Sequence, residues 1–160
     1  MTTEAMEIER KFLVAALPDL GAAKPVAVRQ GYLTLPADSV EMRLRQKGSK
    51  LLMTLKSGEG MAREERETTI TQEQFDIFWP ATGGRRIEKT RWTGNLSDGT
   101  VYELDIFEGS HAPLRLVEVE FDSLAAARSF TPPDWFGSEV TGERGYSNKV
   151  MALEGAPASP

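Results

Sequence analysis

Charged residues occupy every second position in one segment of this chain after another, and this alternation is the feature that most constrains its fold. Near the N-terminus, an extended strand places Glu7, Glu9 and Lys11 on one face and Ile8 and Phe12 on the other. At least six later segments repeat the pattern. The residues that share a face in them are Arg43 and Arg45; Thr54 and Lys56; Arg63, Glu65 and Glu67; Lys89 and Arg91; Glu103 and Asp105; and Glu118 and Glu120.

Strands dominate the predicted secondary structure. Eight are expected, at residues 6–14, 27–34, 39–47, 50–57, 62–70, 86–94, 100–107 and 115–121. Turn-forming residues at 47–49 and 95–99 predict two hairpins.

Few helices are expected. One opens with Thr71 as N-cap, in a capping box with Gln74, and another opens with Asp122 as N-cap. Short helical segments are also predicted near residues 18–21 and after Pro132.

A barrel explains the repeated charged faces better than an open sheet does. For any one strand, the simplest explanation is an antiparallel sheet with one face in water and the other on the core. Seven such strands weigh against it, because eight strands close readily into a barrel and few helices are available to cover apolar surface. The predicted fold is α+β and mainly antiparallel β: a closed eight-stranded β-tunnel with a few helices packed outside. Charges are expected to face a water-filled interior, because a dry one would not tolerate them, and apolar residues to face outward.

Composition excludes several classes of protein. The chain has 160 residues and a net charge of −5, which fits one domain and disfavours non-specific binding to nucleic acid. Without cysteine it has neither disulfides nor Cys-ligated zinc. With no recognisable signal peptide or membrane-spanning run, a cytoplasmic protein without a membrane partner is expected.

His111 is predicted to be a solvated loop residue. Residues 1–153 are predicted to form the domain, followed by a flexible tail at 154–160.

The charged faces indicate a polyanionic ligand and a hard cation. Arg contacts phosphate bidentately and Lys acts as a point charge, and the seven bases on these faces exceed what one phosphate needs. A chain of several phosphates is therefore predicted. Paired carboxylates without nearby His or Cys suit Mg²⁺ or Mn²⁺. A metal ion with a polyphosphate is the usual arrangement for phosphoryl transfer.

Nine segments, in their order along the chain, are similar to the motifs of a known family. They are Glu7-x-Glu9-x-Lys11, Arg29-Gln30-Gly31-Tyr32-Leu33, Arg43-x-Arg45, Thr54-x-Lys56, Arg63-x-Glu65-x-Glu67, Glu88-Lys89-Thr90-Arg91, Glu103-x-Asp105-x-Phe107, Glu118-x-Glu120 and Tyr146-Ser147-Asn148. They extend over residues 6–153 and resemble the CYTH superfamily, the triphosphate tunnel metalloenzymes. The resemblance implies an eight-stranded β-tunnel that acts on a triphosphate with a divalent metal.

The resemblance also implies roles for individual residues. The phosphates are expected to be bound by Lys11, Arg43, Arg45, Lys56, Arg63, Lys89 and Arg91. The metal is expected to be bound by Glu7, Glu9, Asp105, Glu118 and Glu120, with Glu103 as a further ligand or water-positioning group. The residues expected to take part in catalysis are Glu65, Glu67, Lys11 and Tyr32, with the general base open between Glu65 and Glu67.

The leading hypothesis for function is the metal-dependent hydrolysis of inorganic triphosphate (tripolyphosphate) to diphosphate and phosphate. The family resemblance implies it, and Trp79, Trp92 and Trp135 are not spaced as a platform for a nucleobase. The alternatives are a class IV-type adenylyl cyclase, a thiamine or nucleoside triphosphatase, and a non-catalytic polyphosphate-binding module. A homodimer is the expected assembly on general frequency alone.

Overall fold

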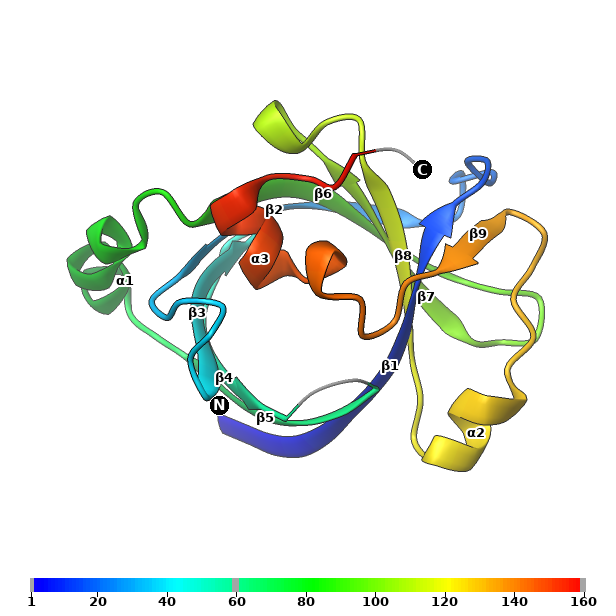
Figure 1. The fold of residues 1–160 in the computed structure, drawn as a ribbon, viewed down its shortest axis with the longest axis horizontal. Coiled ribbons are helices and arrows are strands. Elements are labelled where there is room, and N and C mark those ends of the chain that lie inside the picture. The colour runs from blue at the N-terminus through cyan, green and yellow to red at the C-terminus, as the bar shows by residue number, and fades with distance from the viewer. Residues whose placement is uncertain (1, 59–60, 159–160) are drawn as a thin grey trace.

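A closed barrel of eight antiparallel strands forms the body of the protein (Figure 1). The computed structural model describes residues 2–58 and 61–158. Within them the strand order is β5-β4-β3-β2-β6-β7-β8-β1, and the pairing of β5 with β1 closes the ring. A ninth strand, β9, pairs with the C-terminal part of β1. The predicted β-tunnel is confirmed.

The elements follow the chain in a simple order. They are β1 (Thr2–Val14), β2 (Lys24–Tyr32), β3 (Val40–Lys47), β4 (Lys50–Ser57), β5 (Ala62–Thr69), α1 (Gln72–Phe78), η1 (Trp79–Thr82), β6 (Arg86–Asn95), β7 (Val101–Phe107), η2 (Gly109–His111), β8 (Arg115–Glu120), α2 (Leu124–Ser129), β9 (Phe136–Glu139), η3 (Arg144–Tyr146) and α3 (Asn148–Glu154). Because consecutive strands from β2 to β5 and from β6 to β8 pair as neighbours, most of the barrel is built from hairpins.

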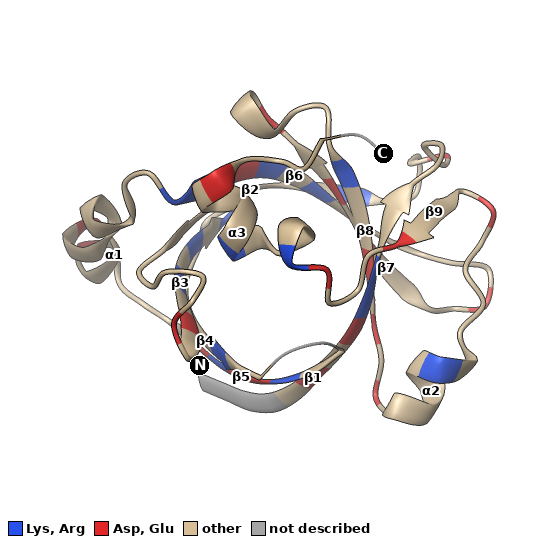
Figure 2. Ribbon diagram, in the orientation of Figure 1, with Lys and Arg blue, Asp and Glu red and all other residues tan. Residues whose placement is uncertain are grey.

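The register brings the charged faces of the strands together. Glu7 of β1 lies opposite Arg63 of β5, and Lys11 lies opposite Glu118 of β8. Directly opposite residues share a face of the sheet, so the alternation on one strand continues on the next. Figure 2 shows the resulting blue and red segments around the ring. The predicted charged interior is therefore present.

The interior is not charged along its whole length, which corrects the prediction that apolar residues face only outward. Tyr32, Ile87, Phe107 and Leu116 share strand faces with the charged residues, yet they form a buried apolar cluster with Met151 of α3. In Figure 1, α3 lies within the ring of strands. The alternation continues to the strand ends, but the residues there are apolar, and a helix from the C-terminal segment packs on them.

A second apolar cluster covers the outside of β1, β7 and β8. It includes Phe12, Leu104 and Val117, and Phe130 and Phe136 from the region of α2 and β9 pack on it. This cluster agrees with the prediction that outward-facing apolar residues are covered by helices and loops.

Arg10 fixes α2 and β9 against β1. Its guanidinium donates two hydrogen bonds to Glu139 of β9, at 2.9 and 2.7 Å, and one to the carbonyl of Ala127 in α2, at 2.9 Å. It also lies over the rings of Phe12 and Phe130. Arg10 faces away from the charged interior and therefore has a structural role.

The helices agree with the sequence in part. The capping box of Thr71 is confirmed at the start of α1. The N-cap of α2 is Ser123 rather than Asp122, because the hydroxyl of Ser123 accepts the hydrogen bond from the backbone N–H of Ala126. In the described chain no helix forms at residues 18–21 or 132–135.

His111 is buried, not solvated as predicted. Its Nε2 lies 2.6 Å from the backbone carbonyl oxygen of Met151, in α3. The sequence did not predict α3, and the burial of His111 follows from where that helix packs. The helix ends at Glu154, one residue beyond the predicted domain end, while residues 159 and 160 of the predicted tail lie outside the described residues.

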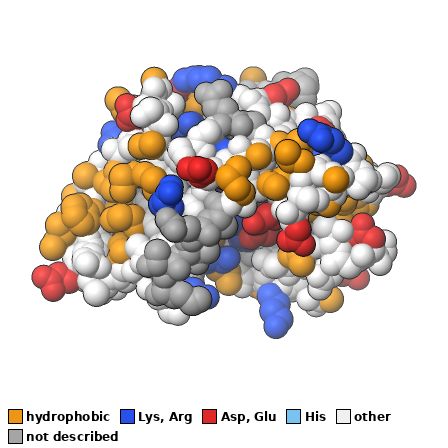
Figure 3. Space-filling view, turned by 90° about the horizontal axis from the view of Figure 1, so that it is seen from below, with side chains coloured by type: hydrophobic (Ala, Val, Ile, Leu, Met, Phe, Trp, Pro, Cys, Tyr) orange, Lys and Arg blue, Asp and Glu red, His pale blue; other side chains and the backbone are white. Residues whose placement is uncertain are grey.

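Some apolar side chains remain exposed on α1. Ile77 and Phe78 are exposed by 63% and 43%. In the view of Figure 3, hydrophobic side chains gather on the side where α1 lies in Figure 1. Among the described residues, every helix is too short or too polar to span a lipid bilayer.

Candidate active site

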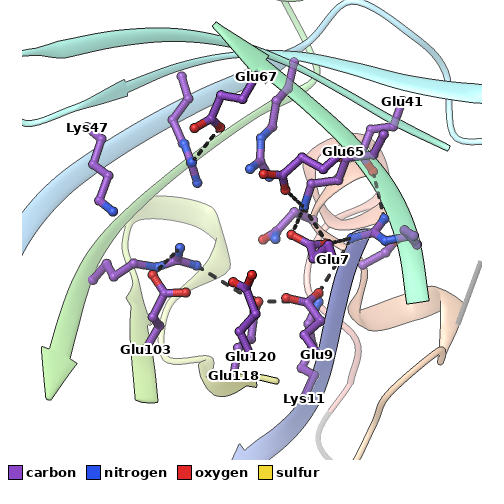
Figure 4. A pocket seen from close by; sticks show the side chains of 17 residues that line it. Glu7, Glu9, Lys11, Glu41, Lys47, Glu65, Glu67, Glu103, Glu118 and Glu120 are labelled. Carbon is purple, nitrogen blue, oxygen red and sulfur yellow. Dashed lines mark hydrogen bonds and ion pairs between the residues drawn. The ribbon is translucent and has the colours of Figure 1, made fainter. Parts of the chain in front are cut away.

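The charged side chains line one cavity of about 210 Å³ inside the barrel (Figure 4). Its described lining residues include seven bases and eight acids but no apolar or aromatic residue. The bases are Lys11, Arg43, Arg45, Lys47, Lys56, Arg63 and Arg91. The acids are Glu7, Glu9, Glu41, Glu65, Glu67, Glu103, Glu118 and Glu120, and Ser147 and Asn148 complete the lining. Most of the predicted site residues are therefore brought together here.

Glu7 is held by two cations from neighbouring strands. Lys56 Nζ donates to both of its carboxylate oxygens, at 3.0 and 2.9 Å, and Arg63 donates to one of them at 3.1 Å. Burial alone would raise the pKa of Glu7, but Lys56, a hydrogen bond with Glu65, and Arg63 together outweigh it and lower that pKa to about 2. This carboxylate is ionised and neutralised within the protein itself.

Asp105 is held in the same way, but deeper in the wall. Lys89 Nζ lies 2.7 Å from one oxygen, and Arg91 binds both oxygens at 2.7 and 2.8 Å. Burial would raise the pKa of Asp105, but the two cations lower it. Burial also lowers the pKa of Lys89 to about 8. Of this cluster only Arg91 lines the cavity, so Lys89 and Asp105 lie behind the cavity surface.

Arg43 and Arg45 each have a hydrogen-bond donor without a partner among the described residues. In both, this donor is the buried Nε atom. Burial and two neighbouring cations, Arg43 and Arg91, lower the pKa of Arg45 to about 10, although Glu67 lies 3.4 Å from its Nη2. An anion would bind the unpaired donors and offset the positive charge around Arg45, so this part of the cavity is suited to phosphate.

Glu9 and Glu118 form a carboxyl pair. Burial and the nearby Glu118 raise the pKa of Glu9 well above its usual value. The pKa of Glu118 is lowered instead, because Lys11 and Arg91 outweigh its burial. Two close carboxyls cannot both ionise without a counter-charge, so one retains a proton that a cation can replace. Glu120 lies opposite Glu9 in the register and lines the same cavity.

Among the described residues, no three acidic or histidine side chains are already grouped as a metal site. Any metal would therefore need further ligands from water or from a bound substrate.

Glu65 and Glu67 differ in their surroundings. Burial and Glu7 raise the pKa of Glu65 to about 7, although Lys56 lies 3.6 Å away. Glu67 accepts a hydrogen bond of 2.8 Å from the hydroxyl of Thr54. A carboxyl group with a pKa near neutral pH is suited to act as a general base, so Glu65 fits that role.

Lys11 lines the cavity, whereas Tyr32 does not. Lys11 Nζ lies 3.1 Å from the carbonyl oxygen of Tyr146 and 4.0 Å from Glu118. The hydroxyl of Tyr32 accepts a 2.7 Å hydrogen bond from Gln30 within the buried interior, and burial raises its pKa. Tyr32 therefore belongs to the apolar cluster and is not among the described residues that line the cavity.

Four lining residues were not assigned to binding or catalysis from the sequence, although two of them, Ser147 and Asn148, belong to one of the nine segments that resemble the family. Glu41 and Lys47 have the same strand parity as Arg43, so the alternation alone identifies them. Ser147 and Asn148 come from a segment with no strand pattern, and only the position of α3 brings them to the cavity.

Comparisons with known proteins agree with this architecture. Residues 5–129 match the CYTH domain family. An inorganic triphosphatase from Nitrosomonas europaea is 58% identical over 147 residues, which is 92% of this chain and 97% of that protein. One from Acetivibrio thermocellus is 35% identical, covering 91% of this chain and 92% of that one. The crystal structure of the inorganic triphosphatase NE1496, 55% identical, superposes with a TM-score of 0.72 over 94% of this chain and 97% of that one. This chain belongs to the CYTH domain family.

Proposed function

We propose that the protein hydrolyses inorganic triphosphate to diphosphate and phosphate inside its barrel, with a divalent cation. The charged cavity carries the proposal, because none of its described lining residues offers an apolar or aromatic surface. A nucleobase or a thiamine ring system would need such a surface, so the lining favours a bare phosphate chain over ATP or thiamine triphosphate. Two relatives that are named inorganic triphosphatases support this choice.

The substrate would be bound by the bases at the cavity surface. Arg43, Arg45 and Arg91 line the cavity, and the buried Nε atoms of Arg43 and Arg45 have no hydrogen-bond partner among the described residues. Lys11, Lys56 and Arg63 supply further positive charge. Lys89 would act from behind the surface, through the ion pairs of Asp105.

The residues fit a divalent cation at Glu9, Glu118 and Glu120. The pKa of Glu9 is raised because burial and Glu118 outweigh the nearby cations, so this carboxyl pair is not fully neutralised by the protein. Mg²⁺ is commonly held by one or two carboxylates together with substrate phosphates and water, and Mn²⁺ accepts the same oxygen ligands. A cation bound here would neutralise the charge that develops on the phosphate oxygens.

Glu65 is the proposed general base. With a pKa of about 7 it is partly ionised at neutral pH and able to accept the proton of a water molecule. That water attacks a terminal phosphorus, the bond to the bridging oxygen breaks, and diphosphate leaves. Glu67, which is bonded to Thr54 and close to Arg45, would position this wall of the cavity.

Other predicted roles remain predictions. The cations around Glu7 and Asp105 favour a positioning role for these carboxylates over the predicted metal ligation. The burial of Tyr32 favours a supporting role in the apolar cluster. The cytoplasmic location, the homodimer, and the absence of nucleic-acid and membrane partners also stay predictions.

Phosphate release tests the proposal directly. Inorganic triphosphate, ATP and thiamine triphosphate are compared with Mg²⁺, with Mn²⁺ and with EDTA, and Glu118→Gln prepared in parallel controls for contaminating phosphatases. Fast, cation-dependent release from inorganic triphosphate is the expected result. Preference for an organic triphosphate, a cyclic product from ATP, or tight binding without turnover would each replace this function with one of the alternatives.

A further inference from the structure

Asn148 brings an uncharged amide to the wall of the charged cavity. Apart from Asn148 and Ser147, the described lining residues of that cavity are all charged. Asn148 is the first residue of α3, the helix that lies within the ring of strands (Figure 1). Its Oδ1 atom is buried and has no hydrogen-bond partner among the described residues.

A buried polar atom without a partner calls for an explanation. Leaving such an atom unbonded destabilises a folded protein, so buried amides are normally paired. The amide of Asn carries an acceptor at one end and two donors at the other, and rotating the group exchanges them. Asn148 therefore offers a donor and an acceptor at a cavity suited to phosphate.

The position of this amide is fixed from two sides. On the far side, Val150 and Met151 of α3 are buried, and the carbonyl of Met151 lies 2.6 Å from Nε2 of His111. On the near side, the carbonyl of Tyr146 accepts a hydrogen bond from Lys11 Nζ at 3.1 Å. The segment that carries Asn148 is thus anchored both to the barrel wall and to a base of the cavity.

A neutral group has a particular advantage at this place. The cavity already brings together seven bases and eight acids, most of which pair with one another. A further base would repel the cation, and a further acid would repel the phosphates. An amide adds a hydrogen bond to phosphate without changing the charge balance.

We propose that Asn148 is a substrate-binding residue whose amide donates a hydrogen bond to a phosphate oxygen of the bound chain. This inference rests on the proposed function and deepens it, because it assigns a contact to the C-terminal segment in addition to the strands. It makes the position of α3 part of substrate recognition.

Replacing Asn148 with aspartate separates substrate binding from a structural role. Asn148→Asp keeps the shape of the side chain, and a negative charge in the first turn of a helix is favourable for the helix. If Asn148 only supports α3, any loss of activity in Asn148→Asp or Asn148→Ala should be accompanied by a loss of melting temperature. If it contacts phosphate, Asn148→Asp should be the worst substitution, because a carboxylate would face the substrate.

The expected results are specific. Asn148→Ala raises KM for triphosphate about tenfold, the loss of one charge-assisted hydrogen bond, with kcat changed less. Asn148→Asp raises KM about a hundredfold or more while its melting temperature stays within a few degrees of wild type. The matched control is Asn95→Asp, which makes the same change at the exposed end of β6 and should behave as wild type. Calorimetric titration with triphosphate in EDTA should show the same order of affinities without any metal.

The two proposals fail in different ways. If wild-type protein neither binds nor hydrolyses inorganic triphosphate, the proposed function is wrong. If wild type is active and Asn148→Asp has a KM within twofold of it, the proposed function stands and the role of Asn148 is refuted. A parallel loss of melting temperature and activity in Asn148→Ala and Asn148→Asp would also refute it, because that is the signature of a structural residue.

Discussion

Replacing Asp105 with asparagine removes the charge that holds two buried cations in place. Lys89 and Asp105 have only 1% of their side-chain surface exposed, and their charged atoms are 2.7 Å apart. In Asp105→Asn, Arg91 would still have two carboxylates within ion-pair distance, Glu103 at 3.0 Å and Glu118 at 3.8 Å. Asp105 is the only carboxylate within ion-pair distance of Lys89 among the described residues. The substitution therefore leaves a buried ammonium group without its counter-charge.

The expected loss of stability is large. Removing one partner of a buried ion pair costs about 3–5 kcal/mol, because the other charge remains in a poorly solvated place. For a protein of this size, each kcal/mol lowers the melting temperature by about 2–4 °C, so a decrease of about 6–20 °C is expected. The free energy of unfolding is measured by urea denaturation, followed by tryptophan fluorescence.

The pH dependence gives a second and independent check. Burial lowers the pKa of Lys89 from 10.5 to about 8, and Asp105 partly opposes that decrease. Between these values the folded protein binds fewer protons than the unfolded chain, so the stability contributed by Lys89 rises with pH. In Asp105→Asn the pKa of Lys89 falls further, so the pH range in which stability rises with pH extends to lower pH. The deficit in stability should therefore be larger at pH 6 than at pH 9.

An exposed ion pair supplies the control. Glu154→Gln makes the same chemical change in the pair with Arg144, which is 3.0 Å long with half or more of each side chain exposed. Its cost should be about 0.5 kcal/mol or less. If Asp105→Asn costs as little as Glu154→Gln, or if its deficit is the same at both pH values, the reasoning about the buried cluster is refuted.

Three predictions concern activity. Glu118→Gln should lower phosphate release at least about a hundredfold and shift the dependence on Mg²⁺ to higher concentrations, since one of the proposed cation ligands loses its charge; an unchanged Mg²⁺ titration would remove Glu118 from the site. The rate should rise with pH through about 7 as Glu65 loses its proton, and Glu65→Gln should abolish that rise in a pH–rate profile. Arg45→Ala should raise KM for triphosphate about tenfold through the loss of a forked phosphate contact; an unchanged KM would make Arg45 structural.

Much of the fold was predictable because strand alternation is a local property. The side chains of a strand point to opposite faces in turn, so Glu7, Glu9 and Lys11 share a face whatever the rest of the chain does. The same rule places Arg43 and Arg45 together, and the cavity lining confirms both groups. The hairpin turns and the capping box of α1 are local in the same sense.

The C-terminal segment was not predictable in this way. Its residues from Val140 to Met151 show no strand alternation, and α3 has only 7 residues. What places α3 is the apolar cluster formed by distant strand ends, among them Ile87 and Leu116. The burial of His111 and the position of Asn148 depend on that packing, so their surroundings could not be inferred from neighbouring residues.

The sequence by itself determined which side chains face the interior, and their charges indicated a phosphate chain and a cation. Only the tertiary structure decided which of those charges are neutralised by an opposite charge and which are not. Glu7 is paired with Lys56, 49 positions away, whereas Glu9 faces Glu118 and keeps a raised pKa. The physical reason is that ionisation depends on burial and on distances of a few ångströms between strands. Closure of the barrel sets those distances, and the spacing of residues along the chain does not.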